Sequence, residues 1–497
     1  RLSVKTVFLE YSKQVVDKKN VIIYGINEMA LITKRTLVKD IKANYKVVAF
    51  IDDSKADVGK KLDGLNIYSS DKMEQVLSTF GISILIIANK NIANKKKSKI
   101  IDLCLNNDVK VLTLPNVNSW INGELSIKQI RNFKIEDLLE RKPIELDIEK
   151  IKKDALNQVV LVTGAAGSIG SEIVKQLLRF KPKKIIIFDQ AESPLYELEL
   201  ELNEKYQFNN FEIVIGNITD GYRIKKVFET FKPSIVYHAA AYKHVPMMEN
   251  NPAEAIRANI LGTKTVADLS IKHSVRKFVM VSTDKAVNPT NVMGASKRIA
   301  EIYIQSLNDL KQTKFVTTRF GNVLGSNGSV INRFRKQIEK GGPVTVTHPQ
   351  ITRFFMTIPE ACQLVLEAGA MGNGGEIFVF DMGTSVKIVN LAKKMIKLSG
   401  FELGKDIQIN FSGLRPGEKL YEELLNNKEN TNKTHHPKIM IGKVETYNLE
   451  QIQQKISDLI SLIAENDNFK IVRMMKKIVP EFKSQNSEYE IIDLEKK

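Results

Sequence analysis

The chain has 497 residues, of which 43% are hydrophobic and 26% charged, and this composition is typical of a water-soluble protein with more than one core. Its formal net charge of +17 suits an anionic partner, but the basic residues are spread among 57 acidic ones and no nucleic-acid motif accompanies them, so we exclude nucleic acid. The two cysteines, Cys104 and Cys362, lie far apart and exclude a disulfide framework. No apolar run approaches the ~18 residues that a membrane-spanning helix requires.

The first 120 residues alternate apolar runs with polar helical stretches, a pattern that predicts a small parallel sheet with helices. The runs cover residues 20–24, 47–53, 84–88 and 111–115. Of the three glycines that a dinucleotide-binding turn uses, only Gly25 follows the first run. We therefore predict that residues 1–120 form a small Rossmann-like accessory domain with a regulatory or packing role.

Residues 121–157 are charged and irregular and are predicted to be a linker. The next segment opens with the apolar run 159–163, after which glycines recur at every third position, at Gly164, Gly167 and Gly170. This spacing predicts a strand, a tight turn and a helix whose free N–H groups face a phosphate. Thr163, Ser168 and Ile169 belong to the same predicted phosphate cradle.

A second apolar run ends at Asp189, whose carboxylate can accept hydrogen bonds from an adenosine ribose. The same carboxylate would repel a 2′-phosphate, so NAD is favoured over NADP as the cofactor. Further β-rich runs at 213–218, 235–238, 278–283 and 315–323 predict a Rossmann-type doubly wound parallel sheet with its ligand at the carboxyl ends. Two more sets of cofactor-binding residues are predicted there, namely Asn217 and Ile218 beside the adenine and the small Ala239, Ala240 and Ala241.

After the last run, Gly and Pro punctuate the sequence to about residue 443, which predicts a C-terminal substrate-binding cap over the carboxyl edge of the sheet. Residues 444–497 are predicted to be a helical tail. Ile452, Ile456 and Leu459 recur there at helical spacing, which indicates an amphipathic helix that packs on a core or a partner and precedes a polar end.

The stretch 282–298 contains Thr283-Asp284-Lys285 at the end of a strand and Lys297 on the following helix. Together with the glycine turn and the Arg415-Pro416-Gly417-Glu418-Lys419 segment, it resembles the extended short-chain dehydrogenase/reductase superfamily. Within that superfamily it is similar to the large UDP-N-acetylglucosamine 4,6-dehydratases of bacterial polysaccharide-biosynthesis and protein-glycosylation pathways. The resemblance covers residues 158–443 as an NAD-binding catalytic domain with a UDP-sugar cap.

The same resemblance implies three further properties. The family is membrane-associated, at the cytoplasmic face of the bacterial inner membrane, through an N-terminal segment that is absent here, so we expect this chain itself to be soluble. Relatives are commonly homo-oligomers, dimers or higher, that associate through helices flanking the active site. The activity implied is that of a nucleotide-sugar dehydratase, a lyase.

One position departs from the superfamily pattern. Most members carry Tyr four residues before the active-site Lys, and this chain has Met293 there, whose thioether cannot transfer a proton. Either the chain is an inactive cofactor-binding fold, or Thr283, Asp284 and Lys285 perform the proton transfers. The resemblance favours the second alternative, because the large dehydratases also lack the Tyr.

The resemblance implies that hydride leaves C4 of the sugar, water is eliminated across C5 and C6, and the hydride returns to C6. Elimination requires a base for the C5 proton and an acid for the C6 hydroxyl. We expect Lys285 to be the base, neutral because burial beside Lys297 lowers its pKa, and Asp284 to be the acid, with a raised pKa. Thr283 would bond the C4 oxygen, and Lys297 would also hold the nicotinamide ribose of the cofactor.

The predicted substrate-binding residues border the UDP-sugar, with arginines on its pyrophosphate. They are Lys243, His244, Asn322, Arg333, Arg353, Arg415 and Glu418. The sequence shows no spacing typical of a metal site. Two alternatives to the dehydratase stay open: a UDP-sugar 4-epimerase, which needs no acid and base at C5 and C6, and a catalytically inactive dinucleotide-sensing scaffold.

Overall fold

The computed structural model describes residues 18–39, 44–89, 92–114, 130–132, 144, 146–206, 208–423, 431–442 and 447–495. Within these ranges the chain divides into two compact units. The smaller falls within residues 1–141, 338–343 and 391–409, and the larger within 142–337, 344–390 and 410–497. In the ranges given, no helix combines the length and apolar character needed to cross a membrane.

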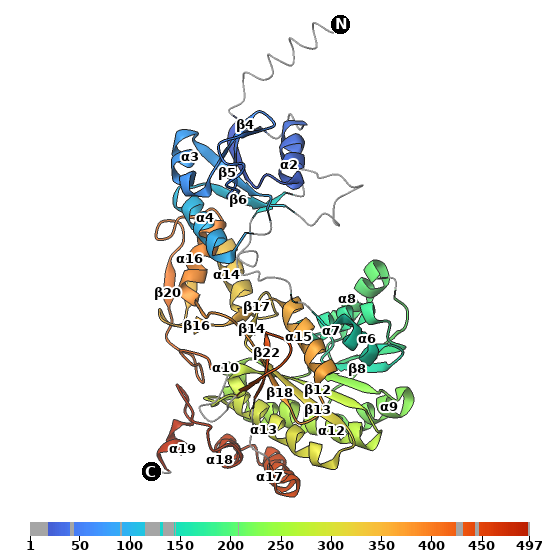
Figure 1. Ribbon diagram of the computed structural model, residues 1–497. Helices are drawn as coiled ribbons and strands as arrows, with labels where there is room; N and C mark the ends of the chain where they lie inside the picture. Colours follow the sequence, from blue (N-terminus) through green and yellow to red (C-terminus); the bar gives the residue numbers. More distant parts are fainter. Residues whose placement is uncertain are drawn as a thin grey trace. The chain divides into compact units, whose positions relative to one another are not determined.

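The smaller unit contains a sheet of seven strands in the order β3-β4-β2-β1-β5-β6-β7, the blue part of Figure 1. Its central strands β4, β2, β1, β5 and β6 run parallel, and β3 and β7 are antiparallel at the edges. The four strands predicted from the sequence are confirmed. The elements are β1 (Lys19–Tyr24), α2 (Glu28–Lys39), β2 (Tyr45–Ile51), β3 (Lys61–Leu62), β4 (Leu65–Tyr68), α3 (Met73–Thr79), β5 (Ile82–Ile87), α4 (Asn94–Asn106), β6 (Lys110–Thr113) and β7 (Arg131–Asn132).

The larger unit contains a sheet of nine strands in the order β10-β9-β8-β11-β12-β13-β18-β22-β21. The first seven strands are parallel to one another, whereas β22 pairs antiparallel with β18 on one side and with β21 on the other. The strands are β8 (Val159–Thr163), β9 (Lys184–Asp189), β10 (Phe211–Ile215), β11 (Ile235–His238), β12 (Lys277–Thr283), β13 (Lys314–Phe320), β18 (Ile377–Phe380), β21 (Thr431–Lys433) and β22 (Ile439–Gly442). The order reverses between β8 and β11, which opens a crevice at their carboxyl ends. The predicted Rossmann-type doubly wound sheet is confirmed.

Helices cover both faces of this sheet (Figure 1). One face packs on α9, α12 and α13, and α17 and α18 join the same apolar cluster. The opposite face packs on α6, α7, α8 and α15. The helices are α6 (Ile148–Ala155), α7 (Ser168–Leu177), α8 (Glu192–Glu201), α9 (Gly221–Phe231), α10 (Val245–Asn250), α11 (Pro252–Ala255), α12 (Thr263–Lys272), α13 (Val292–Ser306), α15 (Ile358–Met371), α17 (Leu449–Ser461), α18 (Asn468–Ile478) and α19 (Glu490–Leu494).

The segment predicted as a cap contains short strand pairs in place of a second large sheet. The pairs are β14 with β17, β15 with β20 and β16 with β19. The elements of this segment not yet given are β14 (Asn322–Val323), α14 (Val330–Glu339), β15 (Val344–Val346), β16 (Thr352–Arg353), β17 (Phe355–Met356), β19 (Val386–Lys387), α16 (Ile388–Leu398) and β20 (Ile409–Phe411).

Two predicted segments differ from the structure. Most of the predicted linker 121–157 lies outside the described residues, but its last part forms α6, because Ile151 and Ala155 lie four residues apart and both are buried in the larger unit. The predicted polar end of the chain instead forms α18 and α19. There Ile471 and Val472 enter the same apolar cluster as α17, so these helices are part of the core.

Helix α13 is enclosed by the chain itself. Every residue of α13 except Gln305 is buried, because the sheet lies on one side of it and α17 and α18 pack against it as well. The expectation that the chain forms homo-oligomers through helices flanking the site stays a prediction, and α13 itself is covered by α17 and α18 of the same chain.

Ile456 tests this packing. Its side chain is 0% exposed in the cluster that joins α17 to the sheet, so Ile456→Ala should lower the free energy of unfolding by about 2–5 kcal/mol through lost contacts and a cavity. Urea unfolding measures the change. The matched control is Ile491→Ala on α19, where the side chain is 56% exposed and the expected change stays within about 0.5 kcal/mol. Equal effects of the two substitutions would contradict the packing described.

Candidate functional site

The turn between β8 and α7 is built on glycine. Gly164 has φ +68°, and a Cβ atom there would lie 2.5 Å from the backbone N of Ala240 at the end of β11. A Cβ on Gly170 would lie 2.2 Å from the Gly164 carbonyl oxygen, so the first turn of the helix packs directly on the backbone of the turn that precedes it. These close approaches leave the first N–H groups of α7 facing the carboxyl end of the sheet, as a phosphate cradle requires.

Asp189, the last residue of β9, supports the turn. Its Oδ2 accepts a hydrogen bond from the Ala166 N–H at 3.0 Å, and its Oδ1 accepts one from the Ala191 N–H at 3.0 Å. Each carboxylate oxygen has two acceptor sites, so both retain capacity for a ligand hydroxyl. Asp189 thus fixes the cradle and also offers the acceptor that the sequence predicted.

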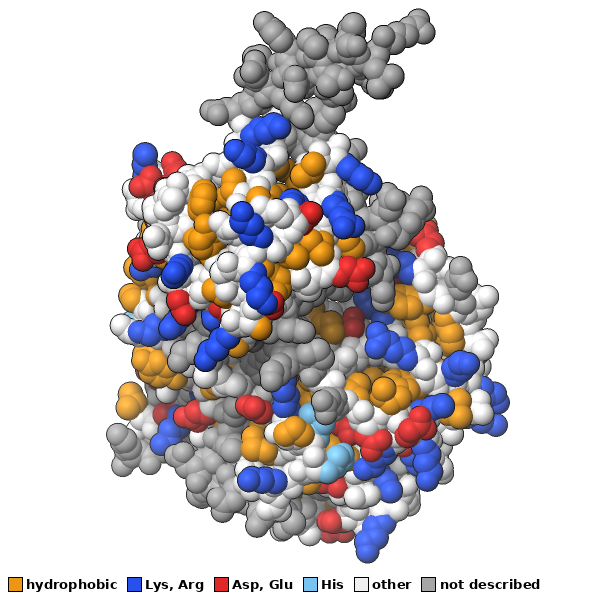
Figure 2. All heavy atoms as spheres, turned by 45° about the horizontal axis from the view of Figure 1, so that its top comes forward, with side chains coloured by type: hydrophobic (Ala, Val, Ile, Leu, Met, Phe, Trp, Pro, Cys, Tyr) orange, Lys and Arg blue, Asp and Glu red, His pale blue; other side chains and the backbone are white. Residues whose placement is uncertain are grey.

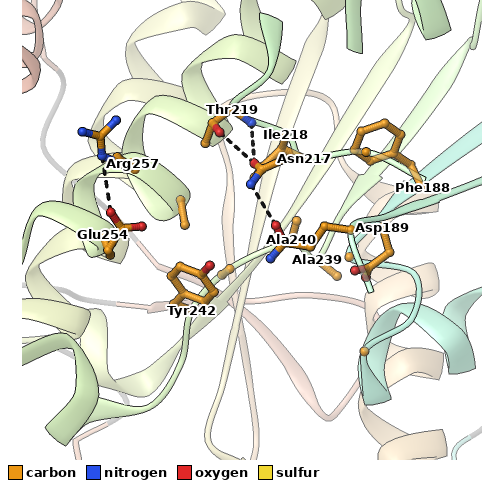
Figure 3. A pocket seen from close by; sticks show the side chains of 16 residues that line it. Phe188, Asp189, Asn217, Ile218, Thr219, Ala239, Ala240, Tyr242, Glu254 and Arg257 are labelled. Carbon is orange, nitrogen blue, oxygen red and sulfur yellow. Dashed lines mark hydrogen bonds and ion pairs between the residues drawn. The ribbon is translucent and has the colours of Figure 1, made fainter. Parts of the chain in front are cut away.

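A cavity of about 290 Å³ lies along the carboxyl ends of these strands (Figure 3). Eight predicted cofactor residues line it: Gly164, Gly167, Asp189, Asn217, Ile218, Ala239, Ala240 and Ala241. Sequence reasoning missed the others: Phe188, Gln190, Gly216, Thr219, Tyr242, Glu254, Arg257 and Ala258. Figure 3 shows Asp189 at one end and the ion pair of Glu254 with Arg257, at 3.4 Å, at the other. An ion pair of this kind carries no sequence motif, which explains why it was missed.

The remaining predicted cofactor residues are not among those that line the cavity. Thr163 is buried and its hydroxyl bonds to His238 Nδ1 at 2.7 Å, while the His238 Nε2 bonds to Thr263 at 2.9 Å. Burial lowers the pKa of His238 to about 3, so the ring is neutral. Ser168, Ile169 and Gly170 form the first residues of α7, where the Ser168 hydroxyl accepts a hydrogen bond from the Asn327 N–H at 3.1 Å.

Thr283, Asp284 and Lys285 lie together where β12 ends. The Thr283 hydroxyl donates to Asp284 Oδ1 at 2.9 Å, and Lys285 Nζ lies 3.0 Å from the same oxygen. Asp284 Oδ2 is buried and has no hydrogen-bond partner among the described residues. The structure therefore brings the three predicted catalytic residues into one hydrogen-bonded cluster with an unused carboxylate oxygen.

The protonation of this cluster agrees with the prediction in part. Burial raises the pKa of Asp284, and the nearby negative charge of Glu422 raises it further, as predicted for an acid. Burial alone would lower the pKa of Lys285, but the negative charges of Asp284 and Glu422 outweigh it and raise that pKa. The expectation of a lowered Lys285 pKa is wrong, since the sequence did not reveal the second carboxylate.

The helix after the cluster carries the unusual methionine. Met293 is buried within the apolar cluster on α13 and serves as core packing. Lys297, one turn later, is also buried, and its Nζ donates to the Val281 carbonyl oxygen at 2.9 Å. Burial lowers the pKa of Lys297 to about 8, so it is Lys297, and not Lys285, whose ammonium is destabilised.

The predicted substrate residues lie at several places in the structure. Arg353 and Arg415 both reach Glu418 Oε1, at 3.3 and 3.2 Å, so this carboxylate already has two cationic partners. Asn322 Oδ1 accepts a hydrogen bond from Lys285 Nζ at 3.1 Å and thereby joins the catalytic cluster. Arg333 is exposed on α14 and stays a prediction.

Lys243 and His244 follow β11. Lys243 Nζ donates to the Ser326 hydroxyl at 3.4 Å, and burial with the nearby Lys285 lowers its pKa. The pKa of His244 is also lowered, first by burial and then by Lys243 and Arg415. Clustered cations that depress one another's pKa values favour an anionic ligand.

Glu422 is the most important residue that sequence reasoning missed. Its Oε1 lies 3.4 Å from Lys285 Nζ and 3.5 Å from Arg353 Nε. The sequence held a weak indication of this role, because Glu422 lies three residues after the Arg415–Lys419 segment. Glu423 follows it directly, however, and the sequence does not show which of the two glutamates enters the site.

Charged side chains are mixed over the face that Figure 2 shows, where Lys and Arg lie among Asp and Glu. Opposite charges interspersed in this way partly cancel, and dissolved salt at about 0.1 M screens exposed charges that lie more than about 10 Å apart. Within the described part of the chain, no group of three or more His, Cys, Asp or Glu has the arrangement of a metal site.

Residues 160–444 match the model of a family described as polysaccharide biosynthesis protein. The chain belongs to this family. It is 47% identical over 465 residues, 92% of this chain and 77% of the relative, to the capsular polysaccharide biosynthesis protein CapD of Staphylococcus aureus. It is 36% identical over 271 residues, 54% of this chain and 77% of the relative, to a UDP-N-acetylglucosamine 4,6-dehydratase (inverting) of Campylobacter jejuni.

A third relative of this polysaccharide biosynthesis protein carries a different name. A UDP-glucose 4-epimerase of Rickettsia canadensis is 36% identical over 283 residues, which make up 55% of this chain and 79% of the relative. These relatives place the chain among nucleotide-sugar-modifying enzymes.

The glycine turn of this family member is open to a direct test. Gly164→Ala should lower the free energy of unfolding by about 1–3 kcal/mol, because the new Cβ overlaps the Ala240 backbone and φ is positive. Gly221→Ala is the matched control, since no heavy atom lies within 4 Å of the added Cβ. Thermal unfolding compares the two variants, and a Gly164→Ala protein as stable as the control would contradict the geometry.

Proposed function

We propose that this protein is an NAD-dependent 4,6-dehydratase of UDP-N-acetylglucosamine that forms a UDP-linked 4-keto-6-deoxy-N-acetylhexosamine. One observation carries the proposal. An aspartic acid with a raised pKa and a lysine share a hydrogen bond of 3.0 Å at the end of β12, and the second carboxylate oxygen of the aspartic acid, Asp284 Oδ2, is buried with no hydrogen-bond partner in the described chain. Elimination of water requires such an acid and base side by side.

The chemistry of the pair follows from its shared proton. Transfer of one proton from Lys285 Nζ to Asp284 Oδ1 produces a neutral amine and a carboxylic acid together, without exchange with water. Burial lowers the cost of this uncharged form, while the charges of Asp284 and Glu422 raise the pKa of Lys285 and keep the ammonium as the resting form, so the proton transfer precedes the elimination. In the uncharged form Lys285 can accept the proton from C5 of the sugar, and Asp284 can donate its proton to the C6 hydroxyl, which leaves as water.

The residues of the cavity suit a dinucleotide. The N–H groups of the turn at Gly164 and Gly167 would hold the pyrophosphate, the Asp189 carboxylate would accept from the adenosine ribose, and the three alanines at 239–241 leave room against the backbone. When bound, NAD would take up hydride from C4 and return it to C6. The carboxylate of Asp189 would repel the 2′-phosphate of NADP, which supports NAD.

The polar residues beyond the cluster suit a UDP-sugar. Lys243, His244, Arg353 and Arg415 supply positive charge for a pyrophosphate, and guanidinium groups can bind it bidentately. Thr283 would bond the C4 oxygen of the sugar, and Lys297 would hold the ribose next to the nicotinamide. In this assignment Asn322 and Glu418 are positioning residues, because they bond to Lys285 and to the two arginines respectively.

A UDP-sugar 4-epimerase is the second candidate, favoured by the Rickettsia relative at the same identity as the dehydratase. Epimerisation moves hydride to and from C4 alone and leaves the C5 proton in place. It makes no use of an acid and base beside C5 and C6. A scaffold that binds a dinucleotide without turnover is the third candidate.

Incubation with UDP-N-acetylglucosamine and NAD in deuterated water, followed by NMR of the product, separates the three candidates. We expect a methyl group at C6 and deuterium at C5. A C4 epimer without deuterium would overturn the proposal in favour of the epimerase, and unchanged substrate with bound dinucleotide would overturn it in favour of the scaffold.

Asp284→Asn and Lys285→Met should each lower kcat by about 10²-fold or more, because each removes one partner of the proton transfer. Initial rates of keto-sugar formation measure the loss. Asp458→Asn is the control, since Asp458 is exposed on α17 and lies 173 positions after Lys285 in the sequence (458 − 285). Either variant retaining the parent rate would refute the assigned role of its residue.

A further inference from the structure

The buried carboxylate of Glu422 is the feature of this site that the assigned chemistry leaves unused. Its side chain is 2% exposed, and Oε1 contacts both Lys285 Nζ, at 3.4 Å, and Arg353 Nε, at 3.5 Å. Oε2 is buried without a hydrogen-bond partner in the ranges that the structure describes. A buried oxygen left unpaired costs about 1–3 kcal/mol, so this arrangement is not explained by stability alone.

Lys285 lies between two buried carboxylates. Its Nζ is 3.0 Å from Asp284 Oδ1 and 3.4 Å from Glu422 Oε1, so one ammonium bridges both groups. Asn322 Oδ1, at 3.1 Å, is a further acceptor for the ammonium. Two carboxylates at one cation cannot both ionise as easily as one, so the groups around them decide which carboxylate holds a proton.

The surrounding charges favour Glu422 as the ionised member. Burial alone would raise the pKa of Glu422, but Lys285, Arg353 and Lys419 outweigh it and lower that pKa. Asp284 faces the same Lys285 and Lys419, but its pKa stays raised by burial and by the charge of Glu422. Lys243 adds a further positive charge near Lys285.

We propose that Glu422 is a positioning residue whose ionised carboxylate holds the Lys285 side chain in place and keeps Asp284 in its acid form. The inference deepens the proposed function and rests on it for the role of Asp284 as the acid. Glu422 itself touches no reacting atom in this assignment. Its effect is electrostatic and passes through the two neighbours.

The first test follows the protonation of Asp284 without any turnover. Infrared difference spectra of the whole protein across a pH titration report the carboxylic C=O band, which Asp284→Asn assigns by its loss. In Glu422→Gln the like charge is gone, so the pKa of Asp284 falls and the band disappears about one pH unit lower than in the parent. A band that titrates at the same pH in both proteins would overturn the inference.

The matched control is Glu423→Gln, in the adjacent position. The Glu423 side chain is 50% exposed, accepts a hydrogen bond from Asn288 Nδ2 at 2.7 Å and lies 4.0 Å from Lys419 Nζ, so its link to the cluster runs through that lysine. We expect its infrared titration to match that of the parent. A shift of equal size in Glu423→Gln would show that any nearby charge suffices and would overturn the specific role of Glu422.

The second test measures the pH dependence of kcat for keto-sugar formation. Asp284 acts when protonated, so kcat falls as pH rises through its pKa, and Glu422→Gln should move this alkaline limb about one pH unit lower, with up to about tenfold lower kcat above it. A purely structural Glu422 would lower kcat equally at every pH. If the parent forms no keto-sugar, the proposed function fails while the infrared result still decides the role of Glu422.

Discussion

The buried ion pair between Glu301 on α13 and Arg319 on β13 is the interaction on which the site depends. Arg319 donates twice, with Nε to Oε1 at 2.9 Å and an Nη to Oε2 at 2.6 Å, and the Ser282 hydroxyl donates to the same carboxylate at 2.7 Å. A bidentate pair fixes orientation as well as distance. Because Ser282 precedes Thr283 on β12, this one carboxylate locks helix and strands together beside the catalytic cluster.

The C-terminal segment extends this rigidity to residues far away in the sequence. The Gln485 N–H donates to the Thr290 carbonyl at 3.1 Å, and the Gln485 carbonyl accepts from the Gly417 N–H at 2.9 Å. The stretch after α18 thus bridges the start of α13 and the loop that leads to Glu418 and Glu422. Arg298 bonds to Glu481 at 3.2 Å and adds a side-chain tie. The tail is therefore a structural part of the site.

Sequence reasoning predicted the features that depend on residues close together in the chain and missed those that depend on residues far apart in it. The glycine turn and Asp189 were predictable, because strand, turn and acid are fixed by local geometry within 30 residues. The raised pKa of Asp284 followed from burial at a strand end. The charge state of Lys285 did not follow, since it depends on Glu422, which is 137 positions away in the sequence (422 − 285) and pairs only in the folded chain. Separation in the sequence also hid the pairing of Glu418 with Arg353, which are 65 positions apart, and the packing of α18.

Met293 is consistent with the proposal that the proton transfers take place at the end of β12. In the superfamily pattern a lysine lowers the pKa of a tyrosine one turn before it, but here that position is an apolar side chain in the core. Lys297 consequently has no phenol to activate and bonds to the Val281 carbonyl, with its own pKa lowered to about 8. Asp284, at the end of β12, is a buried acid within 3.0 Å of a lysine, Lys285. A carboxylic acid beside a neutral amine supplies a proton donor and a proton acceptor together, whereas a single phenol group serves as one or the other at a time. In the proposed function, the methionine at the tyrosine position therefore accompanies the use of an acid and a base for elimination.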